Sequence, residues 1–129
     1  MSSKHLENWH RVKRDLSIEE KRWIHKLLSV NFDGRDILKN QMEYAKVIGS
    51  CLCGCRTIDI EIESKSHCFH NQTRVPVEMI IDNGNSAPTI FYLHVVEGYI
   101  TELEVFKADS SEIKGLISLD NALIRVNSD

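Results

Sequence analysis

The feature that most constrains the fold is a change in the spacing of apolar residues near residue 45. Before this point apolar residues recur every three or four positions, as on one face of an α-helix, and after it they alternate with polar residues. The clearest alternation is in residues 57–63, where Ile58, Ile60 and Ile62 take every second position. Helices followed by consecutive strands are typical of an α+β domain.

Two helices are predicted before the change. Ser17 and Glu20 have the spacing of a capping box, in which each residue caps the backbone of the other, and an apolar stripe begins at Trp23. The second helix is expected over residues 34–44, with Asp33 as its N-cap.

Strands are predicted after the change, with tight turns at Asn83-Gly84 and Glu97-Gly98. Residues 90–96 are apolar on both faces, so we place this strand in the middle of the sheet. The stretch 113–126 fits a further strand or a short helix. We expect a helix pair from the N-terminal third packed on one face of an antiparallel four- to six-stranded meander sheet. The predicted strands are residues 45–48, 57–63, 75–81, 89–96 and 99–106.

The length of 129 residues and the lack of any Pro/Gly/Ser-rich linker predict a single domain over residues 1–129. Residues 1–13 lack apolar periodicity, so we expect a loose N-terminal arm. There is no apolar run long enough for a signal peptide or a membrane span. We therefore expect a cytoplasmic protein that does not contact membranes. Exposed strand edges would allow dimerisation without requiring it, so the oligomeric state stays open.

Four cysteines raise the question of a metal site. On an extended segment Cys51, Cys53 and Cys55 would project to one side, and Cys68 or a histidine could complete a tetrahedral zinc site. The spacing differs from that of most structural zinc sites, so we favour small buried thiols beside the turn at Gly54, without metal or cofactor. A metal- or thiol-dependent module built on these four cysteines is the alternative.

The histidines do not add up to a catalytic site. Cys68 could pair with His67 or His70 as a thiolate nucleophile, and His94 could act as a base. Adjacent strand residues point to opposite faces, however, which separates His67 from Cys68. The chain also lacks a Gly-x-Ser-x-Gly elbow, a Gly-rich phosphate loop and a His-Glu-x-x-His motif. We predict that it is not an enzyme.

The charge balance argues against direct binding of nucleic acid. Sixteen Lys and Arg residues stand against nineteen Asp and Glu residues, for a net charge of -3, the wrong sign for attraction to phosphate backbones. Residues 1–26 are basic, but their charges fit a solvated helix face with Glu19 and Glu20 interleaved. The basic residues of this stretch include Arg11, Lys13, Arg14, Lys21, Arg22 and Lys26.

Acidic residues gather instead on the predicted sheet. Each occupies the side of its strand opposite the apolar residues, and like charges on one sheet face lower stability when they lie directly across from each other. Such a face can meet a basic partner, since complementary potentials speed association and select partners; an ordinary solvated surface is the other interpretation. The six candidate partner-binding residues are Asp59, Glu61, Glu63, Glu78, Glu102 and Glu104.

Three segments, residues 27–38, 47–55 and 98–106, together resemble a widespread group of small bacterial proteins. The overall pattern is similar to immunity proteins of polymorphic-toxin and contact-dependent inhibition systems. The resemblance implies a cytosolic antagonist that binds a cognate toxin domain and covers its active site or substrate surface. A basic nuclease domain would suit the acidic face. A regulatory subunit with an unrelated partner is a further alternative.

Overall fold

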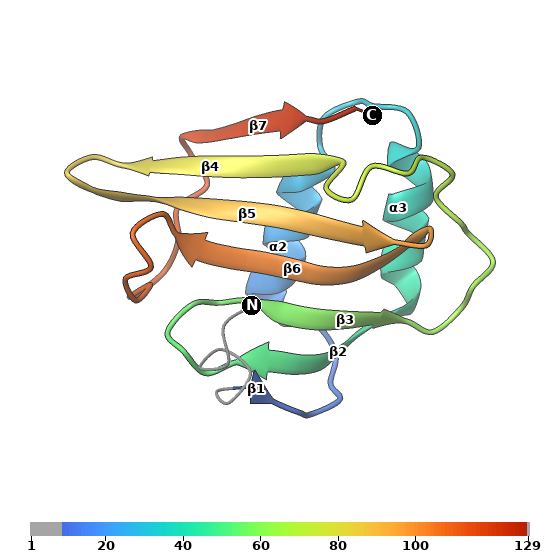
Figure 1. The fold of residues 1–129 in the computed structure, drawn as a ribbon, viewed down its shortest axis with the longest axis horizontal. Helices are drawn as coiled ribbons and strands as arrows, with labels where there is room; N and C mark the ends of the chain where they lie inside the picture. The colour runs from blue at the N-terminus through green and yellow to red at the C-terminus, as the bar shows by residue number, and fades with distance from the viewer. Residues whose placement is uncertain (1–8, 129) are drawn as a thin grey trace.

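The computed structural model describes residues 9–128, which form an α+β fold with two helices and one antiparallel seven-stranded sheet (Figure 1). The helices are α2 (Ile18–Leu27) and α3 (Arg35–Gln41), and the 3-10 turn η1 (Met42–Tyr44) continues α3. The strands are β1 (Trp9–His10), β2 (Ala45–Cys51), β3 (Ile58–Ile62), β4 (Val77–Asn83), β5 (Ser86–Val96), β6 (Tyr99–Lys107) and β7 (Ala122–Val126).

Helix α2 begins as the sequence predicts. The Ser17 hydroxyl accepts from the backbone N–H of Glu20, and the Glu20 carboxylate accepts from the backbone N–H of Ser17. The predicted N-cap of the second helix is wrong, because Gly34 and not Asp33 is the N-cap of α3. Gly34 has a φ of 87°, which favours glycine, so the chain enters α3 through a backbone turn without a side-chain cap.

The strand order is β1-β2-β3-β6-β5-β4-β7, which corrects the predicted meander. Strands β4, β5 and β6 do follow each other through tight turns, and the edge that β6 leaves open is occupied by β3. Residues 63–76 therefore run from β3 past β6 and β5 to β4. Strand β5 is an interior strand, as its apolar residues on both faces indicate.

Two strands were not in the predicted set of five. Trp9 and His10 pair with Cys51 and Ser50 as β1, so this part of the expected loose arm belongs to the sheet; residues 1–8 lie outside the described residues. The stretch 113–126 supplies β7, which pairs with β4. The sheet therefore has seven strands where four to six were expected.

One hydrophobic core lies between the helices and one face of the sheet. Figure 1 draws both helices behind the strands, and the Trp23 ring of α2 packs edge-on against Phe91 of β5, with 5.6 Å between ring centroids. Leu27 and Leu38 are fully buried in the same cluster. No helix within residues 9–128 has the length and apolar character needed to cross a membrane. No helix of the described residues lies in front of the other face of the sheet (Figure 1).

Candidate functional site

The open face, as we name the sheet surface away from the helices, carries most of the acidic residues singled out in the sequence. Asp59 and Glu61 alternate with the buried isoleucines of β3, and Glu102 and Glu104 flank the buried Leu103 of β6. Asp59 is directly opposite Glu102, because β3 pairs with β6. The structure therefore brings together acidic residues that lie about forty positions apart in the chain.

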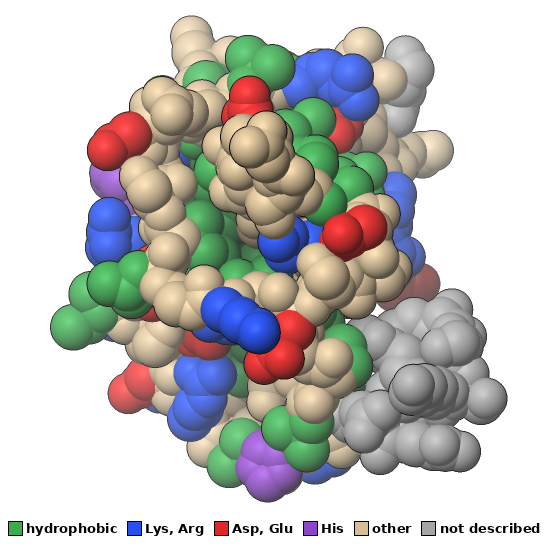
Figure 2. Space-filling model, turned by 90° about the vertical axis from the view of Figure 1, so that its left-hand side faces the viewer, with side chains coloured by type: hydrophobic (Ala, Val, Ile, Leu, Met, Phe, Trp, Pro, Cys, Tyr) green, Lys and Arg blue, Asp and Glu red, His purple; other side chains and the backbone are tan. Residues whose placement is uncertain are grey.

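Basic residues from the N-terminal segment neutralise much of this charge. Arg11 Nη1 lies 3.7 Å from a carboxylate oxygen of Asp59, and Lys13 Nζ lies 2.6 Å from Glu63 and 3.5 Å from Glu61. The face is consequently less acidic than its strands alone suggest. Acidic and basic side chains are also interspersed on the side of the molecule that carries the β4–β5 turn (Figure 2).

Glu78 has a structural role that the sequence pattern does not reveal. Its side chain is only 8% exposed, and one carboxylate oxygen accepts from Arg125 Nη2 at 3.0 Å and from Asn127 Nδ2 at 2.9 Å. These bonds attach β7 to β4. We therefore leave Glu78 out of the candidate contact surface.

The centre of the open face is formed by Glu102, Glu104 and His94. A register shift next to His94 leaves Thr101 without a partner on β5 and places Glu102 opposite His94. Arg74 Nε donates to His94 Nδ1 at 3.1 Å, so the ring proton is on Nε2, which donates to Glu104 at 2.8 Å.

Glu102 differs from the other five acidic residues, because no Lys, Arg or His nitrogen within residues 9–128 lies within 4.0 Å of its carboxylate, whereas Glu104 has His94 and the other four have Lys or Arg. Burial raises the pKa of its half-buried carboxyl, and the like charges of Glu104 and Asp59 raise it further against the opposing effect of His94. One ligand atom each from His94, Glu102 and Glu104 lies within 4.8 Å of the others. A cation placed here would relieve the repulsion between these carboxylates.

An apolar row continues the open face towards β7. Register places Leu123 beside Ile80, Ile80 beside Ile90, and Ile90 beside Phe106. Leu123 is 69% exposed. Tyr92, opposite Glu104, lies one pleat away from this row, so apolar and acidic side chains adjoin on one surface.

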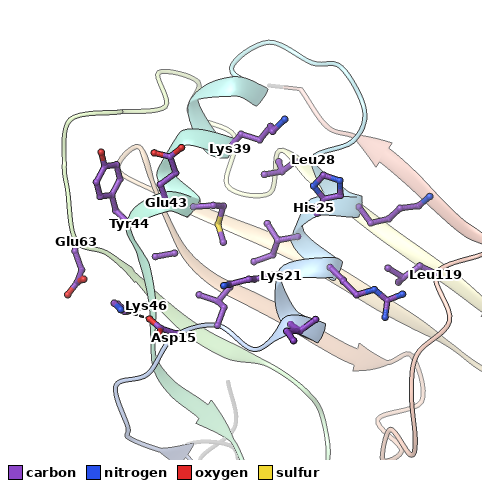
Figure 3. A pocket seen from close by; sticks show the side chains of 17 residues that line it. Asp15, Lys21, His25, Leu28, Lys39, Glu43, Tyr44, Lys46, Glu63 and Leu119 are labelled. Carbon is purple, nitrogen blue, oxygen red and sulfur yellow. Dashed lines mark hydrogen bonds and ion pairs between the residues drawn. The ribbon is translucent and has the colours of Figure 1, made fainter.

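A groove of about 960 Å³ lies on the other side of the molecule (Figure 3). Side chains of α2 and its C-cap, among them Lys21, His25 and Leu28, face Lys39, Glu43 and Tyr44 of α3 and η1 across it. Its lower end is closed by the ion pair of Asp15 with Lys46. The floor is apolar and much of the rim is basic.

Cys51, Cys53 and Cys55, which we name the cysteine trio, do not match the expected set of buried thiols. Cys51 is buried at the end of β2, but Cys53 is exposed and Cys55 is half-buried. Their sulfur atoms nevertheless lie within 4.8 Å of one another. Cys68 is not in this cluster. It packs against Gly98, just before β6 begins. The trio lies near the opposite end of β6, where the N–H of Arg56 donates to the Val105 carbonyl.

The structure does not assemble the catalytic pair that the sequence suggests. The Cys68 thiol donates to its neighbour's carbonyl, that of Phe69, and the His67 ring stacks on Tyr44. Among residues 9–128 no hydrogen bond joins Cys68 to His67 or His70. His94 is held by Arg74 and Glu104 instead.

No known family model, curated protein or solved structure matches the chain. The expected helix face is wrong for Arg11 and Lys13, which precede α2 and pair with acidic residues of the open face. Sequence reasoning missed Arg74, which donates to His94 beside Glu102. The alternation of basic and apolar residues at Arg11, Val12 and Lys13 is the one local signal that this segment runs alongside the sheet.

Proposed function

We propose that the chain is an immunity-type protein, which binds a cognate toxin domain and neutralises it by covering the active site or substrate surface. The contact surface in this proposal is the open face around Glu102. The protein acts by binding alone, without chemistry of its own, in the cytoplasm of a bacterium.

The observation that carries the proposal is the cluster of three carboxylates formed by Glu102, Glu104 and Asp59. Glu102 has no ion-pair partner within residues 9–128, and its neighbours add like charge. A Lys or Arg side chain from a partner would supply the opposite charge in a partly desolvated position, where an ion pair is stronger than at an exposed rim. The adjoining row at Ile80, Ile90 and Phe106 offers the apolar contact that protein interfaces contain at their centres.

The test begins with capture of the partner from the native lysate by the tagged chain, identified by mass spectrometry. The recovered domain is then expressed in bacteria with and without the chain. We expect growth arrest by the domain alone and normal growth when the chain is present. A harmless domain, or a toxic one that the chain does not neutralise, would overturn the proposal.

The contact surface is tested separately by binding titrations in the presence of EDTA. Glu102→Gln with Glu104→Gln is expected to weaken the complex about tenfold or more and to reduce its salt dependence. The matched control, Glu97→Gln with Glu112→Gln, removes the same charge from exposed residues outside the open face and should leave affinity unchanged. Equal affinity of both double variants would exclude the open face as the contact surface. Whether the chain neutralises a toxin would still be decided by the growth assay.

The groove of Figure 3 favours a second candidate, a regulatory subunit that holds a segment of another protein. Lys26 and Lys39 on its rim form no ion pair within the described part of the chain, and Ile18 at its edge is 81% exposed. An apolar floor with a basic rim suits an amphipathic segment with acidic residues. Hydrogen exchange with the recovered partner separates the two candidates: protection of α2 and η1 indicates the groove, and protection of β3 and β6 indicates the open face.

A further inference from the structure

We propose that the cysteine trio binds a thiophilic d10 metal ion, zinc or copper(I), through three thiolate ligands. This inference is independent of toxin binding. Its three ligands come from the end of β2 and the β2–β3 loop, and it does not involve the open face.

The β2–β3 loop brings together the sulfur atoms of three cysteines that occupy every second position of the sequence. Cys51 ends β2, and Gly54, with a φ of 99°, bends the chain back before β3 begins. As a result the sulfur atoms of Cys53 and Cys55 lie 3.1 Å apart, and all three thiols fit within 4.8 Å. A zinc ion with bonds of about 2.3 Å holds neighbouring sulfur atoms about 3.8 Å apart, so the trio reaches this geometry with shifts of about 1 Å.

A backbone N–H group already points at one of the sulfur atoms. The N–H of Cys53 donates to Cys51 Sγ with 3.3 Å between nitrogen and sulfur. Such hydrogen bonds orient metal ligands and stabilise the charge of bound thiolates.

The surroundings hold the loop in place and leave it accessible. The C-terminal segment packs against it, with the N–H of Ile113 donating to the Gly54 carbonyl at 3.0 Å and Arg56 donating to the Gly115 carbonyl at 3.0 Å. Cys51 and Cys55 border a hollow of about 260 Å³. The aliphatic part of the Glu112 side chain lies against Gly54. Water would supply the fourth ligand that zinc needs. Copper(I) needs no fourth ligand.

Binding replaces the thiol protons by the metal and releases up to three protons to solvent. The test uses the full chain, purified under reducing conditions without a histidine tag and freed of metal by chelation. Zinc is titrated against a chromogenic chelator, and copper(I) is titrated against a copper(I) chelator without oxygen. We expect one equivalent of at least one of the two ions to bind, with proton release into weakly buffered solution.

Variants assign the site. Cys53→Ser and Cys55→Ser are each expected to weaken binding at least about tenfold, whereas Cys68→Ser, which removes a thiol outside the trio, should leave affinity unchanged. Circular dichroism of each variant checks that the fold is retained. Absence of binding for both ions would overturn the proposal, and so would undiminished binding by the triple variant that lacks all three trio thiols.

Discussion

The side chain of Gln41 accepts a hydrogen bond from the backbone N–H of Ile100 at 3.0 Å, and both residues are fully buried. The amide nitrogen of Gln41 donates to the carbonyls of Gly98 and His67 at 2.8 and 2.6 Å. One residue at the end of α3 therefore satisfies backbone groups of β6 and of the segment after β3. These hydrogen bonds hold α3 against the start of β6 and against the segment that connects β3 to β4.

Replacing Gln41 by alanine should be strongly destabilising, because the His67 carbonyl and the buried Ile100 N–H lose the partner that Gln41 supplies. The Gly98 carbonyl keeps only its bond from the Phe69 N–H. We expect the free energy of unfolding to fall by about 3 kcal/mol. The measurement is urea unfolding followed by the fluorescence of Trp23, which is buried against Phe91. Asn40→Ala, at the exposed neighbouring position, is the control and should stay within about 0.5 kcal/mol of the parent. Similar losses in both variants would contradict the assigned role.

The Glu20 carboxylate should contribute stability that depends on pH. Burial alone would raise its pKa, but hydrogen bonds from Arg14 at 2.8 and 2.9 Å and from the Ser17 N–H outweigh this effect, and the pKa is lowered. A lowered folded-state pKa means that the stabilisation is present above about pH 4.3, the usual pKa of an unfolded glutamate. It is lost as the pH falls through the folded value.

Unfolding of the parent and of Glu20→Gln between pH 7 and pH 3 measures this contribution. At pH 7 we expect the variant to be less stable by about 2 kcal/mol, with the gap closing as the solution becomes acidic. Glu43→Gln changes an exposed glutamate and should show no such pH-dependent gap. A constant difference for Glu20→Gln over the whole range would rule out the ionised carboxylate as its source.

Local patterns predicted the elements better than their arrangement. Ser17 and Glu20 are three residues apart and cap the same helix, so their relationship can be read from spacing alone. The alternation in residues 57–63 likewise identifies β3. The pairing of Asp59 with Glu102 depends instead on which edge remains open after β4, β5 and β6 have formed, and no periodicity within β3 specifies that edge.

The candidate sites show the same limit. The six acidic residues were identifiable, but four of them meet cations from distant segments, as Lys13 meets Glu63, and this reduces the negative charge expected of the surface. The separation of Cys68 from the trio follows from the path of residues 63–76, which is set by tertiary pairing. The N-cap of α3 is Gly34 and not Asp33, and both its positive φ and the close approach of Phe69 favour a residue without a side chain there. The contact with Phe69 is tertiary and cannot be read from the local sequence.

The three trio thiols should react with iodoacetamide at different rates in the metal-free protein. Burial and the hydrogen bond to Cys53 raise the pKa of Cys51 to about 12, so its thiolate is scarce. Burial opposes ionisation of Cys53 too, but hydrogen bonds from Cys51 and from the Cys55 backbone outweigh it and lower the pKa. Since the thiolate is the reactive form, peptide mapping at pH 8 should find Cys53 modified first and Cys51 last. Faster modification of Cys51 than of Cys53 would contradict the described loop.

Gly34 should tolerate alanine much less well than Gly84, although both have a positive φ. At Gly84, where φ is 67°, a new methyl group meets no atom within 4 Å, so only the backbone conformation costs energy, about 1 kcal/mol. At Gly34 a Cβ would lie 2.4 Å from Cε1 of Phe69, and the ring or the start of α3 has to move. We expect Gly34→Ala to lower the free energy of unfolding by about 3 kcal/mol or more, measured by urea unfolding.

Combining Gly34→Ala with Phe69→Leu, which removes the ring, should lower the free energy of unfolding by less than the sum of the two single changes, because the clash is then absent. Additive costs would mean that Phe69 does not pack against Gly34 as described.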